Sequence, residues 1–191
     1  MIRYLLTFCA LFFFCGAAAA QTKPAVGTRF APSTGGYYEV VAVEGTDVVI
    51  KNNAGTERRW VGGFVLQPAK AGEEEYQKIR SLHPLAPGKS VEFDISGPVA
   101  RGGSAAIHNV VKVLRAETVQ VPAGRFETLV VEWNERNLSQ GSRSAGTASW
   151  IRTYWYAPSL GFVVKFDYRE EGPVTPQRNQ PWELKSISRP K

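Results

Sequence analysis

The stretch Ser90-Val91-Glu92-Phe93-Asp94-Ile95-Ser96 decides the fold class, because polar and apolar side chains alternate along its whole length. Successive side chains of a β-strand point to opposite faces of a sheet, so Val91, Phe93 and Ile95 share one face, and the serines and acidic residues share the other. This pattern is typical of an antiparallel strand that has one face on a core and the other in water.

Turn residues divide the chain after this strand into further short strands. Pro122-Ala123-Gly124 and residues 157–161 supply two tight turns, since proline fixes φ and glycine allows a positive φ. The β-rich runs between the turns predict strands at 107–114 with a continuation to 121, and at 126–133, 149–156, 162–168 and 182–188. With polar loops at 134–146 and 170–180, they predict a mainly β domain over residues 89–191, built as a curved antiparallel sheet or half-barrel.

The region before this domain has three predicted parts. Residues 21–36 are rich in Pro, Gly, Thr and Ser and predict a flexible lead-in. Residues 37–70 hold short β-rich runs separated by turn signals, which predict a small β-meander. A helical connector is expected over residues 71–88. Its first turn is acidic, Tyr76, Ile79 and Leu82 recur at helical spacing, and Pro84 ends the pattern.

The first 20 residues have the composition of a secretory signal peptide. Arg3 supplies a positive charge, an uncharged apolar run extends over residues 4–15, and an A-x-A site ends at Ala20. The sequence therefore predicts cleavage near Ala20 and a periplasmic or secreted mature chain. Retention as a transmembrane anchor is the alternative, but the run reaches the roughly 20 apolar residues of a span only if the alanines are counted.

The positions of the cysteines and the distribution of charge argue against several kinds of bond, modification and ligand. Cys9 and Cys15 both lie in the leader, so a cleaved chain has no disulfide, thiolate nucleophile or cysteine-ligated metal. Lipidation of either cysteine is disfavoured, because phenylalanine precedes each one where a lipoprotein signal has a small residue. The formal net charge is +6, but the basic residues are scattered, whereas nucleic-acid-binding proteins cluster them. No nucleic-acid partner, cofactor or metal is expected.

The sequence contains no recognisable catalytic motif. A G-x-S-x-G nucleophile turn, an H-E-x-x-H metal motif and a phosphate-binding glycine loop are all absent from it. His83 and His108 are far apart, and neither has a carboxylate at motif spacing, so a structural role is expected for each. A non-catalytic protein is therefore favoured. The alternative is a hydrolase of an envelope polymer, which would need two facing carboxylates from the set Glu92, Asp94, Glu132 and Asp167.

Aromatic residues around one arginine form the candidate binding site. Trp150, Arg152, Tyr154 and Tyr156 lie at even spacing on one predicted strand and therefore share a face, whereas Trp155 points to the other face. Amphipathic aromatic rings beside an arginine suit a sugar or an anionic lipid head group, through stacking and cation–π contact. The alternative is that these residues are ordinary cross-strand pairs that stabilise the sheet.

Two hairpin motifs resemble those of a group of bacterial secreted β proteins. Residues 119–128, V-Q-V-P-A-G-R-F-E-T, resemble the group's T-V-x-V-P-A-G-x-F turn, and residues 155–164, W-Y-A-P-S-L-G-F-V-V, resemble its W-Y-A-P-x-x-G-x-V hairpin. The resemblance extends over about residues 82–188. It implies a curved antiparallel sheet similar to the half-barrel of lipoprotein carriers. The group is largely of unknown function, predicted to be periplasmic or lipid-anchored, and its motifs carry no known catalytic residues.

The leader, the resemblance and the aromatic face together predict an exported cell-envelope protein with a binding or assembly role. Its expected partner is a lipid, a glycan or another envelope protein, and its oligomeric state is not indicated. The hydrolase described above and a structural docking module in an envelope complex are the alternatives.

Overall fold

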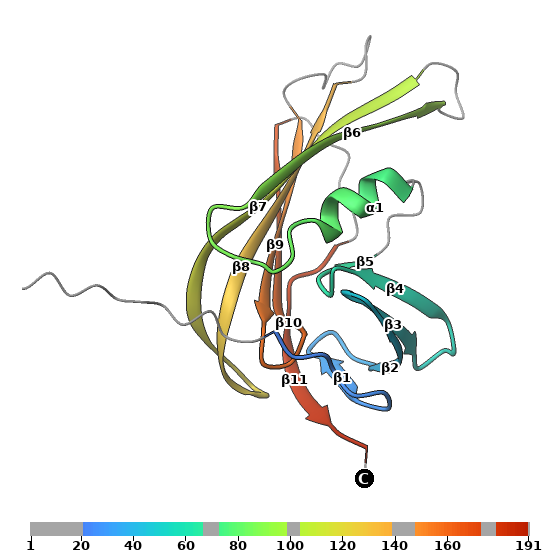
Figure 1. The fold of residues 1–191 in the computed structure, drawn as a ribbon, viewed down its shortest axis with the longest axis vertical. Helices are drawn as coiled ribbons and strands as arrows, with labels where there is room; N and C mark the ends of the chain where they lie inside the picture. Colours follow the sequence, from blue (N-terminus) through green and yellow to red (C-terminus); the bar gives the residue numbers. More distant parts are fainter. Residues whose placement is uncertain (1–20, 67–72, 99–103, 139–147, 173–178, 191) are drawn as a thin grey trace, which may run out of the picture.

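The computed structural model describes residues 21–66, 73–98, 104–138, 148–172 and 179–190 (Figure 1). These parts contain eleven strands and one short helix. In chain order they are β1 (Arg29–Pro32), β2 (Tyr38–Glu44), β3 (Asp47–Asn52), β4 (Glu57–Val61), β5 (Val65–Leu66), α1 (Glu73–Arg80), β6 (Ser90–Pro98), β7 (Ser104–Val121), β8 (Gly124–Asn137), β9 (Ser149–Ala157), β10 (Phe162–Glu171) and β11 (Trp182–Ser188).

The strands form one antiparallel sheet in the order β5-β4-β3-β2-β1-β11-β10-β9-β8-β7-β6. Most strands pair with their sequence neighbours, as hairpins do, and the exception is the pairing of β1 with β11. The long strands β7 to β10 bend, and α1 and the strands β2 to β5 lie on the concave side of that bend (Figure 1). The expected mainly β fold with a curved antiparallel sheet and one short helix is confirmed.

The lead-in differs from its expected character, because residues 29–32 within it form β1. This strand pairs with β2 on one side and β11 on the other, so it joins the meander to the large sheet. The surrounding residues are rich in Pro and Gly, so the short strand is not evident from the composition. Its residue Phe30 is only 1% exposed. The Phe30 ring stacks on that of Phe162 with 4.1 Å between centroids.

Helix α1 is fixed to the meander by a buried carboxylate. Asp47, which is 1% exposed, accepts hydrogen bonds from the Gly62 amide at 2.9 Å and from the side chains of Arg80 and Arg59 at 2.8 Å and 3.2 Å. Burial alone would raise the pKa of Asp47, but these hydrogen bonds outweigh it and lower that pKa. The network holds α1 against the meander.

The first described residues also pack against the body of the protein. The Thr22 amide donates to the Pro158 carbonyl oxygen at 2.7 Å, and Pro24 is buried. Gly161, with φ of +64°, passes so close beneath them that a Cβ there would overlap the Thr22 carbonyl oxygen and lie 2.8 Å from Pro24 Cδ. The segment directly after the expected cleavage site is therefore an ordered part of the fold.

Candidate functional site

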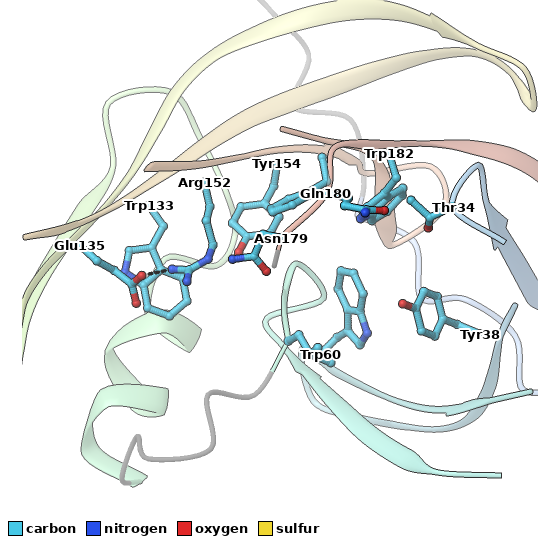
Figure 2. Close-up of a pocket in the computed structure, with 12 residues that line it drawn as sticks. Thr34, Tyr38, Trp60, Trp133, Glu135, Arg152, Tyr154, Asn179, Gln180 and Trp182 are labelled. Atoms are coloured by element: carbon cyan, nitrogen blue, oxygen red, sulfur yellow. Dashed lines mark hydrogen bonds and ion pairs between the residues drawn. The ribbon is translucent and has the colours of Figure 1, made fainter. Parts of the chain in front are cut away.

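A cavity of about 420 Å³ lies between the concave face of β8 to β11 and the meander (Figure 2). The volume falls within the range of about 300–1,000 Å³ that small-molecule sites occupy. The lining residues come from both halves of the sheet and are Thr34, Tyr38, Trp60, Leu66, Trp133, Glu135, Arg152, Tyr154, Phe166, Asn179, Gln180 and Trp182.

One end of the cavity is aromatic. A continuous series of rings runs from the meander to the large sheet, with centroid separations of 6.0 Å from Tyr38 to Trp60, 6.4 Å from Trp60 to Trp182, 6.2 Å from Trp182 to Phe166 and 5.2 Å from Phe166 to Tyr154. Most of these contacts are edge-on or tilted, which the ring quadrupoles favour. The rings form a wall with a large apolar area for an apolar or flat ligand group.

The other end holds a partly buried ion pair. Arg152 Nη1 on β9 donates to Glu135 Oε2 on β8, and the two side chains are 16% and 13% exposed. The guanidinium also lies over aromatic rings, 5.3 Å from the centroid of Trp133 and 6.0 Å from that of Tyr168. Figure 2 shows Glu135, Trp133 and Arg152 together at the end opposite Trp60 and Tyr38. The charged groups therefore lie at one end of the cavity and most of the aromatic rings at the other, where Thr34 and Gln180 add polar groups beside Trp182.

Burial shapes the electrostatics at this end. Loss of hydration raises the pKa of Glu135, although the charge of Arg152 acts in the opposite direction. Burial also raises the pKa of the Tyr154 hydroxyl, which therefore stays protonated. Trp133 is held in place because its Nε1 donates to the buried Asn109 side chain at 2.9 Å. The arginine is therefore the permanent charge of the site.

The structure divides the four candidate residues between different surroundings. Arg152 and Tyr154 line the cavity, Arg152 through its ion pair and Tyr154 through the aromatic series. Tyr156 shares their face but packs between Phe64 and His83, with centroid separations of 6.5 Å and 6.2 Å. Trp150 lies opposite Glu135 and Glu170 in the pairing register but does not line the cavity. Trp155 points to the opposite face, where its ring lies 5.2 Å from Lys165 Nζ.

Most of the lining residues were not predicted from the sequence. Trp133 and Glu135 face the cavity because the β8–β9 register sets Trp133 opposite Arg152, a relation that only strand pairing reveals. One available signal was Arg152 itself, because an arginine that is buried in a folded protein is normally paired with an opposite charge. Trp60 and Tyr38 come from a separate part of the chain, and no local pattern connects them to β9.

The carboxylates of the hydrolase alternative lie elsewhere. None of Glu92, Asp94, Glu132 and Asp167 lines the cavity, where Glu135 is the one acidic residue among those described. His108 has a carboxylate partner after all, since its Nδ1 lies 2.7 Å from Asp94 Oδ1 across β6 and β7 on an exposed surface. Over the described residues, no three His, Cys, Asp or Glu side chains are grouped so as to hold a metal ion.

Within the described ranges no helix has the length and apolar character needed to cross a membrane. The expected leader at residues 1–20, including the cleavage site at Ala20, lies outside those ranges.

Comparison with protein-family models gives no match, and no curated protein matches the chain. Three solved structures are similar at low identity. A protein of Parabacteroides distasonis, provisionally described as a lipoprotein, is 16% identical with a TM-score of 0.42, over 90% of this chain and 98% of that one. The hypothetical lipoprotein YmcC of Escherichia coli is 11% identical with a TM-score of 0.46, over 86% and 83%. A Bacteroides fragilis protein with a YmcC-like fold, provisionally described as exported, is 13% identical with a TM-score of 0.37, over 87% and 98%. Scores this low do not bear on the function of the chain.

Proposed function

We propose that this chain is an exported cell-envelope protein that binds one small amphipathic molecule in the cavity between β8 to β11 and the meander. The observation that carries the proposal is the division of the cavity wall into an aromatic end and an ion-pair end. A ligand with an apolar part and a polar head would bury the first against the rings and direct the second to Arg152 and Glu135. The composition of residues 1–20 supports export.

The proposed role is binding without catalysis. Two-carboxylate hydrolysis needs an acid and a second carboxylate on either side of the bond that breaks. The described wall of the cavity offers Glu135 alone, and its Oε2 is engaged by Arg152. Binding needs only what the wall provides, which is apolar area together with a few fixed polar groups.

Native mass spectrometry of protein purified without detergent from cells expressing the full 191-residue chain tests the proposal. We expect an additional mass that is lost on solvent extraction and that identifies an amphipathic molecule. A protein that always has its apo mass, and that takes up no added amphiphile, would contradict the proposed function. A mass that matches a sugar without an apolar part would contradict the amphipathic assignment.

Two matched tryptophan variants locate the bound molecule. Trp182→Ala removes one ring of the aromatic series and is expected to lower the occupied fraction at least tenfold, because a large part of the apolar contact is lost. Trp155→Ala removes a half-buried ring of the same size from the opposite face and should leave occupancy unchanged. Equal effects of the two variants would place the ligand outside the cavity.

A further inference from the structure

We infer that the ligand carries an anionic head group, which Arg152 binds while Glu135 takes up a proton. This inference rests on the proposed function, because it specifies the charge of the molecule that occupies the same cavity. Its starting point is the closed ion pair at one end of the wall, with both side chains less than one-fifth exposed.

The two members of the pair differ in their ability to lose charge. A guanidinium stays protonated under all conditions in which proteins fold, whereas a carboxylate becomes neutral by taking up one proton. Burial already favours the neutral form of Glu135, and the charge of Arg152 only partly opposes this effect. The site can therefore become positively charged, but it cannot become negatively charged while both side chains stay in place.

This difference between Arg152 and Glu135 favours an anionic head group. When it approaches Arg152, Glu135 is the second negative charge in a poorly hydrated space, and its protonation removes the repulsion. The protonated carboxyl group can then donate a hydrogen bond to the ligand or to a neighbouring oxygen. A cationic head group has no such route, because it would compete with the permanently charged Arg152 for the Glu135 carboxylate.

Arg152 is positioned to keep its place during this exchange. Its guanidinium lies over the rings of Trp133 and Tyr168, and Trp133 is itself fixed by its hydrogen bond to Asn109. The arginine therefore does not depend on Glu135 alone for its position. The aromatic series continues from Tyr154 away from the pair, in the direction an apolar tail would take.

Other titratable groups also lie near the pair, on β9 and β10. Tyr154 on β9 and Tyr168 on β10 are phenols whose pKa values burial raises, so both stay neutral. Glu170 on β10 accepts a hydrogen bond from the Tyr168 hydroxyl at 2.7 Å. The residue opposite Glu135 on β7 is the uncharged Asn109.

Three probes with the same ten-carbon tail test the head-group charge: decane sulfonate, decyltrimethylammonium and decyl maltoside, each below its micelle concentration. Isothermal titration calorimetry on the purified chain in two buffers of different ionisation enthalpy gives both affinity and proton uptake. We expect the sulfonate to bind most tightly and to take up about one proton per molecule bound. Its affinity should rise as the pH falls, by up to about tenfold per pH unit over the range in which free Glu135 is ionised, while the sulfonate keeps its charge.

Matched variants connect the effect to the pair. Glu135→Gln resembles the protonated carboxyl, so it should bind the sulfonate at high pH as tightly as the wild type does at low pH, without proton uptake. Glu132→Gln, on the same strand but paired with Arg169 at 3.7 Å, should behave as the wild type. Arg152→Gln should lose sulfonate binding at every pH, and Arg169→Gln should retain it.

The outcomes separate the two proposals. If the maltoside or the ammonium probe binds as tightly as the sulfonate, or if sulfonate affinity in the wild type does not change with pH, the anionic assignment is wrong while amphiphile binding stands. If no probe binds, both proposals are wrong. Proton counting on the wild type needs no variant, so the test does not depend on the folding of Glu135→Gln.

Discussion

The buried carboxylate of Asp47 contributes to the stability of the fold because several hydrogen-bond donors converge on it. Its carboxylate joins the β3 strand, the Gly62 turn and helix α1 through hydrogen bonds to Gly62, Arg59 and Arg80. Asp47→Asn keeps the shape but removes the charge and one acceptor. We expect it to lower the free energy of unfolding by about 1–3 kcal/mol, measured by urea denaturation at neutral pH. Glu57→Gln, an exposed carboxylate on β4, is the control and should have no measurable effect.

The same residue predicts a pH dependence. The folded-state pKa of Asp47 is lower than its unfolded-state pKa, so the unfolded chain binds the proton more readily. The stabilisation is complete above the unfolded pKa, near pH 4, and is lost as the pH falls through the folded value. Urea denaturation at several acidic pH values should show a steeper loss for the wild type than for Asp47→Asn. Parallel curves would show that Asp47 is not the group responsible.

Among the connecting segments, residues 21–24 pack directly against Gly161, where a side chain would collide with them. Gly161→Ala and Gly45→Ala both place a side chain at a φ near +60°, which costs about 1–2 kcal/mol in each case. A Cβ at position 45 meets nothing within 4 Å, whereas one at position 161 overlaps the Thr22 carbonyl oxygen. Hydrogen exchange should therefore show faster exchange of the Thr22 amide in Gly161→Ala only. Equal protection of Thr22 in both variants would mean that the segment can move aside without losing its hydrogen bond.

Individual strands can be predicted where their signals are local in the sequence. The alternation at residues 90–96 and the turn at Pro122 and Gly124 identify β6, β7 and most of β8, because these signals lie within a few neighbouring residues. β8 continues to Asn137, however, so Glu135 belongs to a strand and not to the expected loop at 134–146. β1 was missed, because four residues among Pro and Gly are too few to show a period. The bulge between Val163 and Lys165 is also invisible in the alternation, yet it shifts the register of β10.

The candidate site is less predictable than the strands for a physical reason. Arg152 and Tyr154 belong to one strand, so their shared face follows from spacing alone. Glu135 reaches Arg152 only through the β8–β9 register, and Trp60 reaches Trp182 only because the sheet curves. These relations depend on the pairing of strands and on the curvature of the sheet, neither of which follows from the spacing of residues along one strand.

At the scale of the whole molecule, the meander and the large sheet should unfold together. They share β1, and the Phe30 side chain from β1 stacks on Phe162 from β10. Phe30→Ala removes this buried ring and is expected to lower the free energy of unfolding by about 3–5 kcal/mol. Near-ultraviolet and far-ultraviolet circular dichroism should still report one common transition at a lower temperature. Leu114→Ala, at a 40% exposed position on β7, is the control.

A separation of the two signals in Phe30→Ala would contradict this expectation. It would mean that the meander loosens while the large sheet persists, and that the two parts are energetically independent in spite of the shared strand.

The pairing of β1 with β11 has a consequence for the cavity. The rings on the two sides of the cavity belong to one hydrogen-bonded sheet, whose two halves, here called arms, are joined by β1 and β11. Tyr38 and Trp60 lie on one arm, and Trp133, Tyr154 and Phe166 lie on the other. The β1–β11 ladder is irregular between Ala31 and Pro32, where the two arms meet. The separation of the two arms, and with it the width of the cavity, therefore depends on the local geometry of the β1–β11 pairing.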